Sequence, residues 1–143
     1  MATTTMRYVA PASRVGRTRA LSVAGASLAA VAVWAVAVPL SGTHLLIRFG
    51  SGAAQSVGFE YVVGASLVAS LAGWGLLALL ERRTARARRT WTGIALVALA
   101  LSLSLPLIAG LTVSSKVALA LMHIAVAAVL IPALRHSSVS LKK

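Results

Sequence analysis

Four long apolar stretches, separated by short polar segments, constrain this chain more than any other feature of its sequence. A helix that crosses ~30 Å of hydrocarbon needs about 20 residues, and each stretch is close to that length. Backbone groups in hydrocarbon must be paired, so only helices or closed barrels cross it, and the alternation of barrel strands is missing. The sequence therefore predicts an all-α bundle of four transmembrane helices, at residues 20–40, 61–80, 91–111 and 117–134.

The charge content supports this prediction. Only 11% of the 143 residues are charged, against about 25% in soluble domains. The net charge of +12 could suggest nucleic-acid binding, but the basic residues flank the apolar stretches and do not line one folded face. We therefore expect no nucleic-acid partner. The chain has no Cys, which excludes disulfides and thiolate metal sites.

The distribution of basic residues predicts the orientation. Twelve of the 14 Lys and Arg residues lie in the tail 1–19, the tail 135–143 and the second connection, whereas the other two connections hold only Arg48 and Lys116. The positive-inside rule then places both termini in the cytoplasm and the domain 20–134 in a cell (plasma) membrane. The second connection should contact anionic lipid headgroups, at about 1 kcal/mol per basic residue, through Arg82, Arg83, Arg86, Arg88 and Arg89.

A cleaved signal peptide is the alternative interpretation of the first stretch. A basic segment precedes it, and Ala35-Val36-Ala37 resembles a cleavage site. The apolar run is longer than the ~7–15 residues typical of signal peptides, which favours a retained span.

The connections and small residues suggest how the spans pack. The first connection, 41–58, is rich in Gly, and its segment 45–49 is apolar enough to lie on the outer membrane surface. The connection 112–116 should be a tight turn that makes the last two spans antiparallel neighbours. Phe59, Tyr61 and Trp91 are expected in the aromatic belts at the membrane interfaces. Small residues repeat every four positions and predict close helix contacts, at Ser22, Ala26 and Ala30 and at Ala65, Ala69 and Gly73.

His123 is the main candidate for chemistry within the spans. It lies six residues into the fourth predicted span, about 9 Å deep, and ionisable groups at such depths usually face the bundle interior. Pro106 lies at a similar depth and frees the carbonyl of Ser102, so Ser102, Ser104 and His123 form one candidate polar layer. The imidazole could join two helices by bonding that carbonyl or Ser104, or it could handle protons or bind a ligand.

The chain contains two acidic residues, and both lie at the ends of the second predicted span. Glu60 should lie at the outer mouth, either stabilised by the positive end of a helix or acting as a cation or proton site. Glu81 is expected to pair with one of the five neighbouring arginines. A bis-histidine haem would need a second His at matching depth, and a hydrolytic metal site would need a cluster of His and acids. We therefore expect no cofactor and no metal.

A series of short motifs in a fixed order runs through the second, third and fourth predicted spans. The motifs are Ala69-Ser70-Leu71-Ala72-Gly73-Trp74, Leu79-Leu80-Glu81-Arg82, Arg89-Thr90-Trp91-Thr92, Ser102-Leu103-Ser104-Leu105-Pro106-Leu107, Lys116 with Leu121-Met122-His123-Ile124-Ala125-Val126, and Val129-Leu130-Ile131-Pro132. In these motifs the chain resembles a family of small actinobacterial membrane proteins with four predicted helices and no assigned function. The resemblance covers nearly the whole chain, most strongly 57–135. It implies the four-helix architecture and a bacterial plasma membrane, and it implies no activity.

Three classes of function remain open at this point. The scarcity of polar residues in the spans favours a non-enzymatic membrane component or accessory subunit, with a second copy or another membrane protein as partner. A small oligomeric transporter or channel is the alternative, although small multidrug transporters, which have four spans, need an acid in the first span and this chain has none there. A membrane enzyme would have to rely on the polar layer around His123, which offers few ionisable groups for acid–base catalysis.

Overall fold

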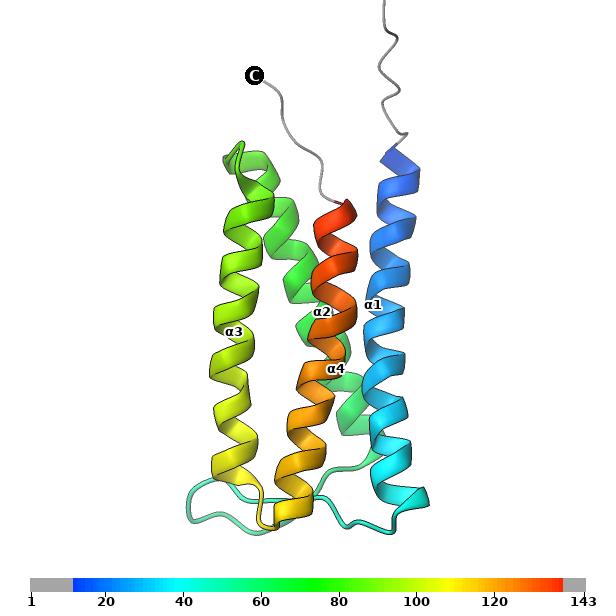
Figure 1. The fold of residues 1–143 in the computed structure, drawn as a ribbon, viewed down its shortest axis with the longest axis vertical. Coiled ribbons are helices and arrows are strands. Elements are labelled where there is room, and N and C mark those ends of the chain that lie inside the picture. Colours follow the sequence, from blue (N-terminus) through cyan, green and yellow to red (C-terminus); the bar gives the residue numbers. More distant parts are fainter. Residues whose placement is uncertain (1–11, 138–143) are drawn as a thin grey trace, which may run out of the picture.

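Four long helices form the protein in the computed structural model, which describes residues 12–137 (Figure 1). All four are long and apolar enough to cross a membrane, so the predicted all-helical architecture is confirmed. Each helix is longer at one end or both than the apolar stretch from which it was predicted. The helical backbone continues into flanking segments that contain basic residues. The helices are α1 (Ala12–Ala35), α2 (Phe59–Arg83), α3 (Ala87–Ala109) and α4 (Val113–Ser137).

The bundle has two distinct ends. Both ends of the described chain and the α2–α3 connection lie at one end, which we call the arginine end (top of Figure 1), and the other two connections lie at the opposite end. Arg7, Lys142 and Lys143, which contributed to the predicted orientation, lie outside the described residues.

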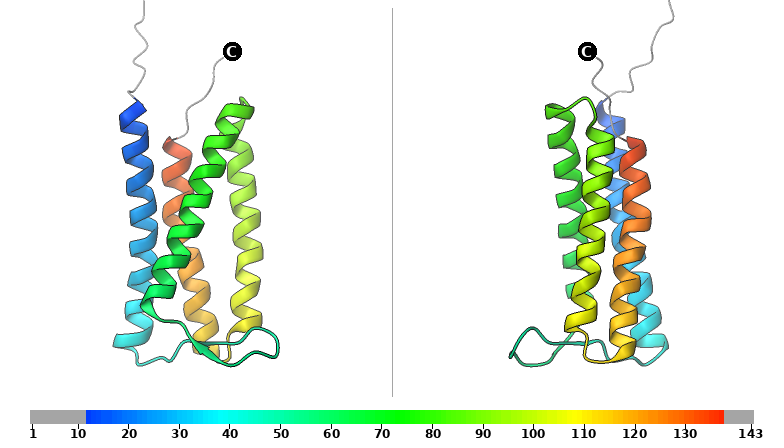
Figure 2. Two further views of the ribbon diagram at one scale, coloured as in Figure 1. Left: turned by 180° about the vertical axis from the view of Figure 1, so that it is seen from behind. Right: turned by 60° about the vertical axis from the view of Figure 1, so that its left-hand side comes forward.

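α2 is inclined relative to its neighbours. α4 packs along both α1 and α3, whereas α2 runs from α1 at one end of the bundle to α3 at the arginine end (Figure 2). α2 and α3 therefore converge at the arginine end and diverge toward the other, and this divergence shapes the candidate site described below.

α1 ends in a π-helical turn, η1 (Val36–Leu40), that contains Pro39. Proline has no N–H for the carbonyl four residues back, so the regular α-helical ladder cannot continue through it. The backbone N–H of Ser41 donates to the Val36 carbonyl at 3.0 Å, and Gly42 follows with a φ of 65°, a conformation that favours glycine. These features turn the chain sharply away from the helix axis.

A short hairpin closes the end opposite the arginines, which we call the hairpin end. Strands β1 (Leu46–Ile47) and β2 (Gln55–Ser56) pair antiparallel, and β1 also bridges to Gly110 in the α3–α4 connection. The N–H of Arg48 donates to the Ala109 carbonyl at 2.9 Å on this second edge. The first connection is therefore hydrogen-bonded to the last, despite being rich in Gly.

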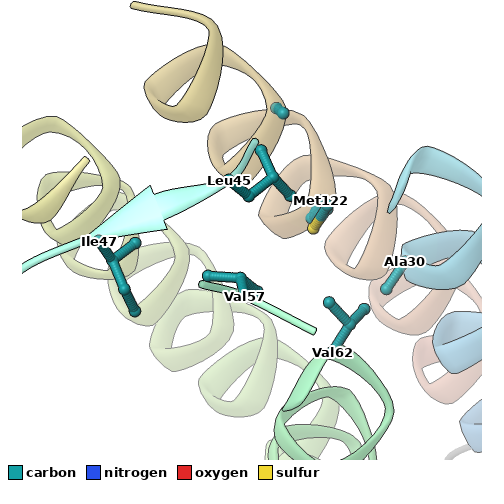
Figure 3. Packing of buried hydrophobic residues seen from close by; sticks show 7 residues of the cluster. Ala30, Leu45, Ile47, Val57, Val62 and Met122 are labelled. Atoms are coloured by element: carbon teal, nitrogen blue, oxygen red, sulfur yellow. The ribbon is translucent and has the colours of Figure 1, made fainter. Parts of the chain in front are cut away.

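The hairpin also packs its apolar side chains into the bundle. Leu45 and Ile47 are only 2% and 6% exposed and lie in a cluster with Val62 and Met122 (Figure 3). The prediction that 45–49 lies on the membrane surface is wrong for these residues, because alternate side chains of an extended segment point to one face. Phe49, beyond the strand, is exposed.

A buried serine joins this hairpin to α4. Ser115, with no exposed surface, donates its hydroxyl to the His44 carbonyl and accepts the N–H of Leu46, both at 3.2 Å. Thr112 Oγ1 accepts the backbone N–H of Ser115 at 3.1 Å, a bond that caps the start of α4. Because α4 begins at Val113, the α3–α4 turn is shorter than the predicted 112–116.

A second buried cluster lies toward the arginine end, around Trp91. The indole is 1% exposed, and its Nε1 donates to the Gly73 carbonyl of α2 at 2.8 Å. Trp91 therefore faces the neighbouring helices, whereas a side chain of an aromatic belt would face lipid. The side chain packs between helices because its N–H finds a backbone acceptor there.

Gly110, in the α3–α4 connection, provides a test of the packing at the hairpin end. A Cβ at this position would lie 2.7 Å from both Lys116 Cγ and the Pro106 carbonyl oxygen, too close for either. We expect Gly110→Ala to destabilise the protein by about 1–3 kcal/mol, measured as a lower melting temperature in detergent. Gly93→Ala is the control, because a Cβ there meets nothing within 4 Å. Equal melting temperatures for the two variants would contradict this account.

Candidate functional site

A cavity of about 460 Å³ lies between α2, α3 and α4, where α2 diverges from α3. Helices that separate in this way leave space between them unless large side chains fill it, and here small side chains line much of both walls. On α2 and α3 they are Ala65, Ala69, Ala72, Gly73, Ala95 and Ala98. We call this space the lateral cavity.

The prediction that small residues spaced by four form close helix contacts is tested on both α1 and α2, and the two helices differ. Ser22, Ala26 and Ala30 are all buried, as expected for close helix contacts. Ala65 and Ala69 are exposed and line the lateral cavity, so the predicted packing role is wrong for these two residues. The buried residues of α2 instead follow a neighbouring line along the helix: Val62, Ser66, Ser70 and Leu77.

His123 lies on the α4 wall of the lateral cavity and is half-buried. Its Nδ1 is 2.7 Å from the carbonyl oxygen of Leu119, one turn earlier in the same helix. A carbonyl only accepts, so Nδ1 carries the proton, and in the neutral ring Nε2 is left as an acceptor. His123 is ten residues after Val113, about 15 Å along the helix axis from the start of α4.

The structure brings only part of the predicted polar layer together. Ser102 lines the same cavity as His123, and its hydroxyl donates to the Leu99 carbonyl at 2.9 Å. Ser104 is exposed, lies outside the cavity lining and donates to its own helix. Pro106 is buried near the hairpin end and does not line the cavity. The expected interhelical bond from His123 to the Ser102 carbonyl or to Ser104 is replaced by the bond to Leu119.

Tyr61 and Ser66 also line the lateral cavity and were not among the predicted site residues. Ser66 donates to the Val63 carbonyl in its own helix at 3.0 Å. Tyr61, expected in an interfacial belt, borders the cavity near the hairpin end. The sequence carries no signal for this role, because it follows from the inclination of α2.

Glu60 folds back over the start of α2. A Cβ on Gly58 would lie 2.5 Å from its Oε1, so the carboxylate lies beside the first turn of the helix. The carboxylate is therefore placed where the helix dipole stabilises negative charge, and Glu60 is absent from the cavity lining. Among residues 12–137, no group of three or more His, Cys, Asp or Glu side chains could hold a metal ion.

Among the described residues, the arginine end carries an exposed basic surface and a largely buried ion pair. All five arginines of the α2–α3 region are exposed: Arg82, Arg83, Arg86, Arg88 and Arg89. Arg19 and Glu81 form the buried pair, with an Nη2–Oε1 distance of 2.6 Å and side chains only 6% and 14% exposed.

Arg19 also contacts the last turn of α4. Its Nη2 donates to the Ser137 carbonyl at 3.1 Å, and its Nε donates to the Ser137 hydroxyl at 3.3 Å. A single guanidinium thus joins α1, α2 and α4. Arg19 lies 62 residues from Glu81 in the sequence and is not one of the five neighbouring arginines among which the partner of Glu81 is predicted.

Removing one member of this pair should leave a charge buried and poorly compensated. We expect Glu81→Leu to lower the free energy of unfolding by about 3–5 kcal/mol, measured by thermal unfolding in detergent. The double variant Arg19→Met/Glu81→Leu should recover most of this loss, because no charge then remains buried. Glu60→Leu, at the exposed acid, is the control and should change stability by about 1 kcal/mol or less. A double variant less stable than the single one would refute this description.

Comparison with known proteins places the chain in a family. Searches of curated proteins and of solved structures gave no match. A comparison with protein families did give a match, to a family of unknown function. The matched region, residues 10–140, is nearly the whole chain and includes all four helices and the lateral cavity. The chain therefore belongs to the family of unknown function DUF6069.

Proposed function

We propose that this chain is a non-enzymatic component of a bacterial plasma membrane, acting as an accessory subunit or stabiliser of a larger membrane assembly. One observation carries the proposal: three of the polar side chains that line the lateral cavity are bonded to their own helices. His123, Ser102 and Ser66 each bond a carbonyl three or four residues earlier. Side chains bonded in this way satisfy their hydrogen-bonding groups within one helix and do not form a relay from one helix to the next.

The positions of the two acids support the same proposal. Proton and cation pathways generally use an ionisable group within the membrane, facing the bundle interior or an aqueous cavity. Glu60 is exposed at the start of α2, and Glu81 is paired with Arg19 at the arginine end. General acid–base catalysis also needs a second group to orient or complement a histidine. Neither acid lines the cavity that contains His123.

The arginine end is the cytoplasmic side in this proposal, with both termini inside. The exposed arginines of the α2–α3 region would then contact anionic headgroups, each contributing about 1 kcal/mol. The hairpin end, where Arg48 and Lys116 lie, would face outward. We also propose an actinobacterial source, in keeping with the resemblance noted from the sequence, and a second copy or another membrane protein as partner.

Single cysteines test the orientation, since the chain has none of its own. Ala53 in the hairpin connection and Ala85 in the α2–α3 connection are both exposed. In intact cells, a membrane-impermeant maleimide should label Ala53→Cys, whereas Ala85→Cys should react only after permeabilisation. The reverse pattern would invert the proposed orientation.

A small transporter is the second candidate, favoured by the presence of the lateral cavity. Reconstituted liposomes with a pH-sensitive dye inside separate the two proposals. We expect an imposed pH gradient to decay at the rate of protein-free liposomes, with no change in Glu60→Gln or His123→Phe, because neither group forms a proton path. Faster decay that is lost in either variant would favour the transporter.

Isolation from native membranes in mild detergent tests the accessory role directly. It should yield a membrane partner at fixed stoichiometry.

A further inference from the structure

The lateral cavity has two chemically different halves. The half nearer the hairpin end contains all four of the polar side chains Tyr61, Ser66, Ser102 and His123, set among apolar residues such as Val62 and Met122. The half nearer the arginine end is apolar, lined by residues such as Leu76 and Leu130, and the N–H of Trp91 is already bonded to Gly73. A ligand that matches both halves is an amphiphile with its hydrocarbon chain toward the arginine end.

The dimensions of the apolar half fit one hydrocarbon chain. From Ser102 to Trp91 is 11 residues along α3, about 16 Å, close to half of the ~30 Å hydrocarbon thickness of a bilayer. The whole cavity, about 460 Å³, is within the ~300–1,000 Å³ range of small-molecule sites. Its walls between α2 and α3 carry exposed alanines, so the space opens sideways, toward the lipid that would surround the helices.

His123 determines which polar group a bound hydrocarbon ligand can carry at the hairpin-end half of the lateral cavity. Nδ1 is engaged by the Leu119 carbonyl, and none of the described residues bonds Nε2, which is left as an acceptor at the cavity wall. An acceptor selects a ligand with an O–H or N–H donor. His123 lies about 15 Å along α4, near the middle of a membrane-spanning helix, where a charged or zwitterionic headgroup would be unfavourable.

We propose that the lateral cavity binds a single-chain amphiphile with an uncharged terminal hydroxyl, such as a long-chain or isoprenoid alcohol. The ligand enters from the bilayer between α2 and α3, and its hydroxyl donates to Nε2 of His123. This inference goes beyond the accessory role proposed above and requires only that the helices lie in a membrane.

A photoreactive probe tests the proposal on the purified full-length chain. The probe is a C16 alcohol with a mid-chain diazirine, and its methyl ether, which cannot donate a hydrogen bond, is the matched probe. We expect peptides of α2 and α3 that border the cavity to be labelled, with the alcohol bound about three- to tenfold more tightly than the ether. His123→Phe should abolish this preference while retaining labelling by both probes.

Two alanine variants on α3 separate cavity binding from general contact with lipid. Ala98 lines the lateral cavity, whereas Ala100 is exposed outside its lining. Ala98→Phe should reduce labelling at least fivefold, and Ala100→Phe should leave it unchanged. Equal labelling of the two variants would overturn the proposal, as would a wild-type chain that binds alcohol and ether equally. A phosphatidylcholine bearing the same diazirine chain that labels the same peptides as strongly would overturn the single-chain assignment.

Discussion

Apolar helices surrounded by lipid gain little by packing their apolar faces together, because lipid chains are as apolar as leucine. The association of four such helices therefore depends on close approach and on a few polar contacts. Close approach is clearest on α1, where Ser22, Ala26 and Ala30 are all buried. Ser27 and Ser70 are also buried, with no hydrogen-bond partner for their hydroxyls among the described residues. These two serines therefore contribute a small side-chain volume, which allows the helices to approach closely.

The polar contacts are distributed along the bundle. At the arginine end Arg19 joins three helices, toward the middle Trp91 donates to the backbone of α2, and at the hairpin end Ser115 joins the first connection to α4. Each involves a strong donor or acceptor that would otherwise be buried unpaired. This arrangement leaves α2 and α3 without such a contact where they diverge, and the lateral cavity lies there.

Much of the fold could be predicted from the sequence, because the lengths of the apolar stretches correspond to one physical dimension, the thickness of a bilayer. The hairpin could not be predicted, since its strands are two residues long and give no periodic signal. The burial of Leu45 depends on contacts with helices that are distant in the sequence. The position of Trp91 near the end of an apolar stretch predicts a side chain in an interfacial belt, and only the proximity of Gly73 explains its burial.

The candidate site could be predicted only in part. His123 and Ser102 line one cavity, as expected from their similar depths on two neighbouring helices. The direction in which the imidazole bonds could not be predicted, because its own helix offers a carbonyl as near as any neighbour does. The cavity itself results from the tilt of α2, and tilt depends on which line of small residues packs against α1. Ala65 and Ser66 are adjacent and both small, so the sequence does not distinguish the two lines.

The contact between Arg19 and Ser137 has a consequence for biosynthesis. Arg19 precedes the apolar part of the first helix, whereas Ser137 belongs to the final turn of the fourth, so more than a hundred residues are translated between them. Until that turn emerges from the ribosome, the guanidinium lacks two of its three acceptor atoms. The contact that joins α1, α2 and α4 at the arginine end can therefore form only when synthesis of the fourth helix is complete. In a chain released earlier, the Arg19 guanidinium lacks the two acceptor atoms of Ser137.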